Sequence, residues 1–441
     1  MSGKAKKKLK RLFRRVRKKL KKTFRKDTAP KKAQPKPKPE QGKSGKPKNE
    51  ATERHIMSVM EKTGWDRAAA LAAMRAAKKD YGVSFGSYDR NDFFKYPPEK
   101  QKAAAEHLAK LKKPGKSAEK EHAIACIMEA TGWDRSLTEE KIAAARERTG
   151  CTAKEYFIYR FFELSEEEQG KVFLICDSKK LREKYDTDKQ FIAMLCNKEE
   201  TDEFFEEYLK RQWCVNTKIT QNEFIKRFSG VSGVIYKPLG GNRGRGVESF
   251  RINSENIADV YNEIASFPPG VVEEYIHQHP DLNRLTDASV NTLRIVTISS
   301  KTSPVTPDGR YADAAYAALR IGGGHSVVDN FHSGGMTAAV DLETGIIVTD
   351  AADMEGHVFA AHPVTGTVIK GFKVPYFKEA VEMALDAISK NRIGGYIGWD
   401  IAITDKGPVL VEVNAGPGVV LLSTPYAAEH KGMKYVMEKY L

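Results

Sequence analysis

The sequence predicts an α+β fold for residues 166–441, preceded by a helical region at 51–165 and a basic segment at 1–50. Three observations support this division: positive charge gathers near the N-terminus, an internal repeat follows it, and short apolar runs then alternate with helical stretches. Such alternation is typical of strands mixed with helices and excludes a helical bundle for the last region. A chain of 441 residues also predicts two or three structural units.

The net charge of +15 belongs to the basic segment rather than to the predicted folded part. Residues 1–48 contain 22 Lys and Arg but only Asp27 and Glu40, so the rest of the chain is slightly acidic. The high isoelectric point therefore does not indicate a nucleic-acid-binding surface, and nucleic acid is not an expected partner.

Residues 1–26 carry an apolar stripe at helical spacing within a nearly continuous run of Lys and Arg. The stripe consists of Leu9, Leu12, Phe13, Val16, Leu20 and Phe24. A basic amphipathic helix of this kind suits an anionic membrane surface. The alternatives are nonspecific contact with nucleic acid or another polyanion and a cationic tail without a specific role. Residues 27–50 contain five prolines and predict an extended linker.

The lack of a recognisable membrane span or secretory signal, together with the pattern of the cysteines, predicts a cytoplasmic protein. No apolar run approaches the roughly 18 residues that span a bilayer, and the N-terminus lacks the apolar core of a secretory signal. The five cysteines show no C-x-x-C spacing, which indicates free thiols rather than a disulfide framework or a zinc site. If the tail binds lipid, the protein would lie peripherally at the inner face of the membrane.

An internal repeat opens the helical region. The octapeptides at 60–67 and 128–135 share Met-Glu and Thr-Gly-Trp-Asp-Arg and lie 68 residues apart. Each copy predicts a helical module whose helix is interrupted at the Gly-Trp turn. Two explanations of the repeat remain open. The modules were duplicated only for packing, or they dock a partner or substrate.

A glycine-rich segment directly follows a predicted strand that ends in a lysine. Glycines let backbone N–H groups approach phosphate oxygens, and a lysine adds a point charge for the phosphates. The segment is neither a Walker A loop nor a dinucleotide-binding turn, and a plain turn is the alternative. The candidate nucleotide-binding residues here are Lys237, Gly240, Gly241, Gly244 and Gly246.

The strand predicted at 271–276 contains two adjacent carboxylates, Glu273 and Glu274. Such a strand can offer backbone groups to an adenine edge and a carboxylate to its amino group or to the ribose. A strand edge with solvated glutamates would show the same pattern.

Arg294 and Arg320 each interrupt an apolar strand, and a polar loop that contains Asn330 follows the second of them. A buried arginine requires an anionic partner. That partner is either a transferred phosphoryl group or a structural carboxylate.

Two strands near the C-terminus bring three oxygen-bearing side chains together. Asp400 and Glu412 lie on the two arms of a predicted hairpin, and Asn414 shares a strand face with Glu412 because it lies two residues further on. Hard oxygen ligands suit Mg²⁺ that bridges nucleotide phosphates. Carboxylates on apolar strands are unfavourable unless they are paired or metal-bound. We therefore predict a Mg²⁺ site here, with a structural acid pair as the alternative.

Taken in order, these motifs resemble the ATP-grasp superfamily over residues 166–441, and in particular its sugar-transfer-associated, teichuronopeptide-biosynthesis-like branch. The resemblance implies two α+β subdomains that clasp ATP, with a mobile lid at about 222–275. It implies catalytic roles for Arg294, Arg320 and Asn330.

The resemblance also implies an ATP-binding lysine some forty residues before Lys237. Lys198 is the preferred candidate and Lys189 is the rival. The segment around His362 fits the branch's pattern too, and we interpret this histidine as a turn residue rather than as a general base.

The reaction that the resemblance implies is an ADP-forming, Mg²⁺-dependent ligation of a carboxylate to an amine through an acyl-phosphate. The carboxylate acceptor would be a small molecule or a glycan in cell-surface polysaccharide or glycoconjugate biosynthesis. Two alternatives stay open: an ATP-dependent kinase acting on a sugar or another hydroxyl, and a membrane-docked scaffold that only binds ATP.

Overall fold

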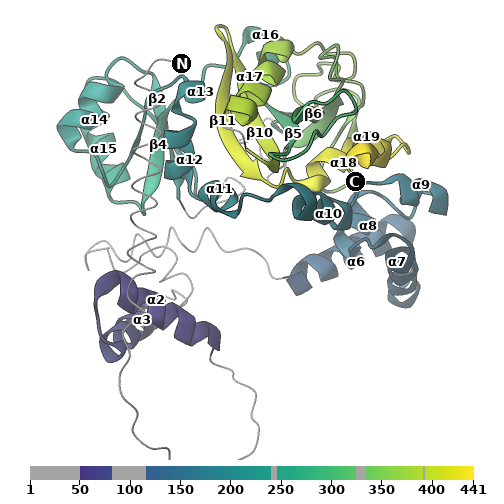
Figure 1. The fold of residues 1–441 in the computed structure, drawn as a ribbon, viewed down its shortest axis with the longest axis horizontal. Helices are drawn as coiled ribbons and strands as arrows, with labels where there is room; N and C mark the ends of the chain where they lie inside the picture. The colour runs from purple at the N-terminus through teal and green to yellow at the C-terminus, as the bar shows by residue number, and fades with distance from the viewer. Residues whose placement is uncertain (1–49, 82–115, 240–245, 324–333, 391–392) are drawn as a thin grey trace, which may run out of the picture. The chain divides into compact units, whose positions relative to one another are not determined.

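The computed structural model describes residues 50–81, 116–239, 246–323, 334–390 and 393–441. Thr52–Leu441 form one compact unit. Within the described part, helices combine with two antiparallel sheets, which confirms the predicted α+β class (Figure 1). The basic tail lies outside the described residues. None of the described helices is both long and apolar enough to cross a membrane.

Both copies of the repeat fold as two helices separated by a short break. The helices are α2 (Glu50–Thr63) and α3 (Arg67–Tyr81) in the first copy, and α6 (Lys116–Thr131) and α7 (Arg135–Thr149) in the second. Gly64 and Gly132 adopt positive φ angles of 74° and 72° directly after the first helix of each copy. Glycine adopts this left-handed conformation without strain, so it ends the helix.

The aspartate of each repeat starts the second helix. The side chain of Asp66 accepts a hydrogen bond from the Ala69 N–H, and Asp134 accepts one from the Leu137 N–H, each at 2.8 Å. An N-cap of this kind satisfies a backbone donor that the helix leaves unpaired. The Thr-Gly-Trp-Asp sequence therefore encodes a helix end followed by a helix start, as the sequence predicted.

The second copy continues into a larger helical core. It is followed by α8 (Ala153–Ile158), α9 (Glu166–Lys171) and α10 (Ile175–Tyr185). Buried aromatic side chains, including Tyr156 and Phe161, pack with α6 and α7 in one hydrophobic cluster. Ala427, near the C-terminus of the chain, belongs to the same cluster. The second helical module therefore packs directly on the C-terminal part of the protein.

A four-stranded antiparallel sheet follows three short helices. The helices are α11 (Lys189–Met194), α12 (Lys198–Phe204) and α13 (Glu206–Leu209); the strands, in sheet order, are β1 (Trp213–Val215), β4 (Gly270–Glu274), β2 (Gly233–Pro238) and β3 (Glu248–Arg251). The helices α14 (Gln221–Phe228) and α15 (Ile257–Ala265) contact each other, and their apolar faces share a core with β2 and β4. This core fixes the strands that carry Lys237 and Glu273.

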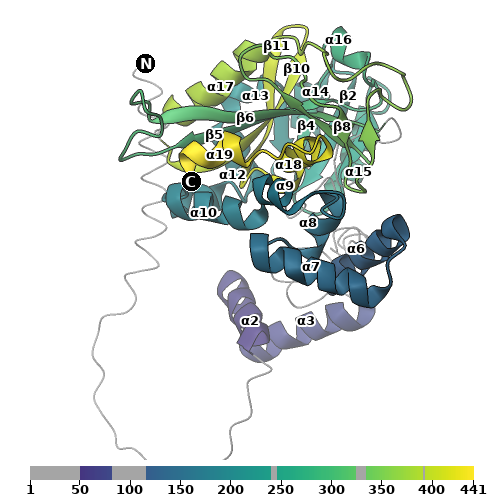
Figure 2. The same ribbon diagram turned by 90° about the vertical axis from the view of Figure 1, so that its right-hand side faces the viewer.

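A seven-stranded antiparallel sheet forms the centre of the C-terminal part. Its order is β11 (Gly407–Ala415), β10 (Gly395–Thr404), β5 (Thr292–Ser299), β6 (Ala312–Ile321), β7 (Met336–Val340), β8 (Ala351–Ala352) and β9 (Val358–Phe359), and the short helix α16 (Pro280–Asn283) precedes β5. The helix α17 (Phe377–Lys390) packs on one face of this sheet. The opposite face packs against α10, α18 (Val419–Ala428) and α19 (Lys434–Met437), as Figure 2 shows.

The face of the large sheet that packs against α18 changes from apolar to charged along its strands. Alternate residues of a strand share one face, so Tyr396 and Asp400 of β10 point to the same side, as do Val296 and Arg294 of β5. Tyr396 and Val296 lie in the apolar core beneath α18. Asp400 and Arg294 carry charge, so the face passes from apolar core to polar site within a few residues of each strand.

Candidate active site

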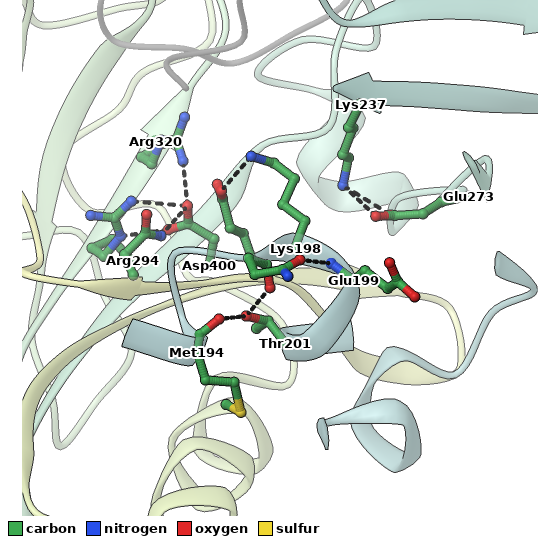
Figure 3. A network of polar contacts seen from close by, with 12 residues as sticks. Met194, Lys198, Glu199, Thr201, Lys237, Glu273, Arg294, Arg320 and Asp400 are labelled. Carbon is green, nitrogen blue, oxygen red and sulfur yellow. Dashed lines mark hydrogen bonds and ion pairs between the residues drawn. The ribbon is translucent and has the colours of Figure 1, made fainter. Parts of the chain in front are cut away.

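A cavity of about 810 Å³ lies between the two sheets. Its walls come from the start of α12, from β2, β3 and β4 of the small sheet, and from β6, β10 and β11 of the large sheet. This volume falls in the range of small-molecule sites, roughly 300–1,000 Å³. Both cationic and acidic side chains from segments far apart in sequence reach the cavity (Figure 3).

Asp400 is the centre of the charge cluster on the large sheet. It is almost fully buried, and its Oδ2 accepts hydrogen bonds from Arg294 Nη2 at 2.9 Å and from Arg320 Nη1 at 2.8 Å (Figure 3). Arg294 also donates through Nε to Oδ1 of the same carboxylate and through Nη1 to the Pro417 carbonyl. The structural alternative that the sequence left open for both arginines, a buried ion pair, is thus present in this structure.

The strand register explains why these groups meet. Asp400 pairs directly with Arg294 across β10 and β5, and Arg320 lies opposite Thr292, two residues from Arg294 on the same face. Directly opposed and diagonal neighbours on one face of a sheet lie within reach of long side chains. A glycine makes room: a Cβ at Gly398 would lie 3.1 Å from Arg294 Cδ.

The two arginines keep Asp400 ionised. Burial acts to raise its pKa, but the charges of Arg294 and then Arg320 outweigh burial and hold the pKa below its usual range. Removal of Asp400 would leave both arginines without this counter-charge, and an unpaired buried charge is strongly destabilising.

The remaining predicted metal ligands lie beside Asp400. Asn414 Nδ2 donates to Asp400 Oδ2 at 3.3 Å, and Glu412 is the residue directly paired with Asp400 across the hairpin. Glu412 is half exposed and lines the cavity. Carboxylate and amide oxygens from these three residues are the donor set that Mg²⁺ prefers, so they fit this metal. The Asn414 amide can present its oxygen by rotating about its terminal bond.

The two candidate lysines of the first nucleotide-binding position lie in different surroundings. Lys198 begins α12, lines the cavity and places its Nζ 3.9 Å from Glu412 Oε1. Lys189 Nζ instead donates to the Asp186 carbonyl at 2.8 Å, and Lys189 does not line the cavity. Of the two, only Lys198 lies where a nucleotide in this cavity would contact it.

On the small sheet, Lys237 forms a second charge cluster with Glu273. Lys237 Nζ lies 3.0 and 2.9 Å from the two carboxylate oxygens of Glu273. Arg211 also donates to Glu273 through Nε at 2.9 Å, and its Nη1 bonds the Leu410 carbonyl of the large sheet. Arg211 therefore connects the two sheets through a single guanidinium.

Both cations act on the ionisation of Glu273. Burial opposes ionisation, but Arg211 and Lys237 outweigh it and lower the pKa of Glu273. Glu274, the next residue, lines the cavity and accepts a hydrogen bond from the Gln212 N–H at 3.1 Å. The predicted pair thus divides: Glu273 is buried in an ion network, and Glu274 is partly exposed at the cavity.

Asp202 is a site residue that the sequence did not reveal. It lies on α12, lines the cavity and is 6% exposed, and its Oδ2 has no hydrogen-bond partner among the described residues. Burial, and then the neighbouring Glu273 charge, raise its pKa well above the ordinary range. A neutral carboxyl in this position can donate a hydrogen bond, which an ionised one cannot.

Some predicted residues are not placed by the structure. Gly240, Gly241, Gly244 and Asn330 lie outside the described residues. Gly246 is described and adopts a positive φ of 72° just before β3. The nucleotide-binding role of the glycines and the catalytic role of Asn330 stay predictions.

His362 lies away from the cavity and is buried. Its Nε2 lies 2.8 Å from the Gly322 carbonyl, and its Nδ1 accepts hydrogen bonds from the Val364 and Thr365 N–H groups at 3.3 Å. Both ring nitrogens are therefore engaged with the backbone, which supports the interpretation of His362 as a turn residue.

Comparison with known proteins assigns a family to this arrangement. The model of the sugar-transfer associated ATP-grasp family matches residues 189–435, more than half of the chain. The chain belongs to this family. The assignment confirms the ATP-grasp fold predicted from the sequence, and the matched range contains both sheets and the cavity between them.

Solved structures of other ATP-grasp proteins resemble this member only distantly. An N5-carboxyaminoimidazole ribonucleotide synthetase is 12% identical with a TM-score of 0.32, over 52% of this chain and 47% of that one. The D-alanine–D-alanine ligase from Bacillus anthracis is 16% identical with a TM-score of 0.32, over 56% and 66%. The D-alanyl-alanine synthetase A from Vibrio cholerae is 13% identical with a TM-score of 0.35, over 55% and 62%.

The chain thus spans less than two thirds of each of these proteins. No curated protein matches it.

The raised pKa of Asp202 predicts a specific dependence of stability on pH. Between the ordinary aspartate value, about 4, and about 8, the unfolded chain ionises Asp202 while the folded protein keeps it protonated. The folded state then binds more protons, so its stability falls as the pH rises. Asp202→Asn mimics the neutral carboxyl and removes this linkage. Denaturant unfolding should show the variant gaining stability relative to wild type from pH 4 to pH 8.

The readout is the slope of that difference, because a packing defect would add an offset that does not change with pH. The difference measured near pH 4 serves as the baseline, since ionisation of the unfolded chain has only begun to destabilise the wild type there. A difference that stays flat across this range would show that Asp202 ionises normally in the folded protein.

Proposed function

We propose that this ATP-grasp protein is an ATP-dependent, ADP-forming ligase that joins a carboxylate acceptor to an amine through an acyl-phosphate. The observation that carries the proposal is the convergence of cations and oxygen ligands in one cavity. Lys198 and Arg320 line it together with Asp400 and Glu412, and Lys237 lines it from the facing sheet. This charge pattern suits a polyphosphate accompanied by a divalent cation.

The cations have a direct electrostatic role in this proposal. Phosphoryl transfer spreads negative charge over the transferred group, and catalysis consists mainly of positioning and charge stabilisation. Lys237 and Lys198 would bind the phosphates from opposite sides of the cavity. Arg320 would meet the transferred group, and Arg294 would act beside it by holding Asp400. The predicted role of Asn330 in the same step stays part of the proposal.

The metal ligands in this proposal are Asp400, Glu412 and Asn414. When bound, Mg²⁺ neutralises phosphate charge and acts as a Lewis acid on a phosphoryl oxygen. The arginines keep Asp400 in the ionised form in which a carboxylate can bind a cation, and Glu412 projects its carboxylate to the cavity. Nucleotide binding would draw Lys237 away from Glu273, and Arg211 would then remain as the counter-charge of that glutamate.

The small sheet is the proposed lid, at about residues 222–275. Its strands β2 and β4 carry Lys237, Glu273 and Glu274, whose side chains line one wall of the cavity. Closure of this wall would exclude water, which would otherwise hydrolyse an acyl-phosphate.

The acceptor class is proposed from the family. The family is described as sugar-transfer associated, which favours a carboxylate on a sugar or glycoconjugate, such as a uronic acid, and a role in cell-surface polysaccharide biosynthesis. In the reaction, a carboxylate oxygen attacks the γ-phosphorus and ADP leaves. The amine nitrogen then attacks the acyl carbon, phosphate leaves, and the nitrogen loses a proton.

The ligase reaction predicts that an oxygen atom passes from the acceptor to phosphate. Full-length protein with ATP and Mg²⁺ is given glucuronic or galacturonic acid, labelled with oxygen-18 in the carboxylate, together with the common amino acids. Mass spectrometry should find one labelled oxygen in the inorganic phosphate and an amide product. Phosphate on a sugar hydroxyl, without label in free phosphate, would instead identify a kinase and overturn the ligase proposal.

The proposed metal site makes a separate prediction for Glu412→Gln. This side chain is half exposed, so its loss should change the free energy of unfolding by no more than about 0.5 kcal/mol. Turnover should fall at least about 100-fold, because a Mg²⁺ ligand is lost. Steady-state ADP formation and denaturant unfolding measure the two effects. Glu343→Gln, at an exposed loop position, is the matched control. Normal turnover in Glu412→Gln would refute the site.

We also propose that residues 1–26 bind an anionic membrane surface and keep the enzyme at the inner face of the membrane. The support is the sequence of this segment alone: a stripe of apolar residues with Lys and Arg between them. Apolar burial and attraction to anionic lipid add together in such a helix.

Deletion of residues 1–26 should abolish sedimentation with phosphatidylglycerol liposomes and leave ATP turnover unchanged. The double substitution Leu12→Ser with Leu20→Ser keeps every positive charge and interrupts the apolar stripe, so it separates insertion from charge attraction. We expect it to weaken binding markedly at physiological salt. Equal binding by the deletion protein would refute a membrane role for this segment.

A further inference from the structure

A second group of metal-ligating side chains lies away from the ATP-grasp cavity. His122 and Cys126 are on α6 of the second helical module, and Glu355 is on the loop after β8. Residues four apart on a helix lie on one face, so the imidazole and the thiol point the same way. The carboxylate of Glu355 reaches them from a segment more than 200 positions later in the sequence.

Two of the three separations between the ligand atoms lie close to those around a tetrahedral zinc ion. Bond lengths of roughly 2.1 Å to nitrogen and oxygen and 2.3 Å to sulfur place ligand atoms about 3.4–3.6 Å apart. His122 Nε2 lies 3.4 Å from Glu355 Oε2 and 3.7 Å from Cys126 Sγ. All three ligand atoms lie within 4.8 Å of one another. Cys126 Sγ also lies 3.8 Å from His122 Nδ1, so rotation of these side chains would bring all three ligand atoms onto one ion.

The loop that carries Glu355 is held in place by its own hydrogen bonds. Asp353 Oδ1 accepts from the N–H groups of Glu355 and His357, both at 2.9 Å. Arg160 Nη1, from the end of the helical module, donates to the Gly356 carbonyl at 3.3 Å. Met354 packs against buried clusters on both sides of this junction. The backbone on either side of Glu355 is thus positioned without any metal.

The helical ligands are oriented in a similar way. The Phe157 ring meets the His122 ring edge-on, with centroids 6.3 Å apart, and Cys126 is partly buried against the hydrophobic cluster of the module. Packing of this kind limits the rotamers that the ligands can adopt, which favours metal binding by reducing the entropy that is lost.

We propose that His122, Cys126 and Glu355 form a Zn²⁺ site, with solvent at the fourth position, although the cysteine spacing in the sequence indicated no zinc site. One thiolate, one imidazole and one carboxylate are a ligand set that suits this borderline-soft ion. Binding releases the thiol proton of Cys126 to solvent. The ion joins α6 to the loop at 353–357, and so fastens the repeat module to the domain that holds the ATP-grasp cavity.

The site gives the second repeat a role that the first copy does not share. With the repeat period of 68 residues, Arg54 and Ser58 occupy the positions equivalent to His122 and Cys126. An arginine side chain offers only hydrogen-bond donors and a serine offers no thiolate, so the first copy lacks both helical ligands.

Zinc binding by the tag-free, full-length protein tests the site. We expect about one Zn²⁺ per chain after dialysis against a weak chelator, and a thiolate-to-metal absorption band when Co²⁺ replaces it. Cys126→Ser should lose the band, and Cys126→Ser and Glu355→Gln should each weaken Zn²⁺ binding at least about tenfold. Cys196→Ser, at another cysteine, and Glu129→Gln, one turn along the same helix, are the matched controls and should bind normally.

Hydrogen exchange gives a readout that is independent of affinity. Zinc should slow exchange at residues 353–357 in wild type and in Glu412→Gln, but not in Cys126→Ser. Because Glu412→Gln affects only the proposed ATP chemistry, the two proposals can fail separately. Zinc binding that survives in Cys126→Ser, or a Co²⁺ complex without a thiolate band, would reduce the group to a surface ion pair and overturn the proposal.

Discussion

The buried carboxylate of Asp400 is the interaction on which the site depends. Two arginines from neighbouring strands and one asparagine from the hairpin partner donate to it within a sheet whose adjacent positions are apolar. Each group is acceptable there only because the others are present, since an unpaired buried charge is strongly destabilising. The same cluster fixes the strand face on which Glu412 and Asn414 lie, so fold stability and the proposed metal chemistry rest on one set of contacts.

A second charge cluster faces the first from the small sheet. Arg211 supports Glu273, and Glu273 in turn holds Lys237 in place, so the lysine is positioned before any nucleotide arrives. Arg211 also donates a hydrogen bond to the backbone of β11, so it forms a polar connection between the two sheets. Asp202 lies beside this network as a carboxyl that resists ionisation. Nucleotide binding would therefore act on a balanced group of charges rather than on one free lysine.

Much of the fold was predictable, and the misses have a common cause. The long strands β5, β6 and β10 appear where the sequence predicted apolar strands around Arg294, Arg320 and Asp400. The short strands β1, β3, β8 and β9 were not predicted, because two to four residues carry too little periodicity. Asp202 was missed because it lies in the charged run at 198–203, whose composition is typical of an exposed helix, and Arg211 was missed for a similar reason. Arg211 lies in the polar run at 210–212, which has the composition of an exposed turn, so nothing local marks it as buried.

The sequence by itself determined the α+β class, the turn of the repeat, and the family through the order of its motifs, because these depend on local spacing and on residue type. It also placed Asp400, Glu412 and Asn414 on one hairpin face through the period of two. Only the tertiary structure decided that Arg294 and Arg320 share Asp400, that Lys198 rather than Lys189 reaches the cavity, and that His122 and Cys126 meet Glu355. These contacts join segments far apart in the chain. A local sequence pattern does not show which two buried charges will pair in the folded protein.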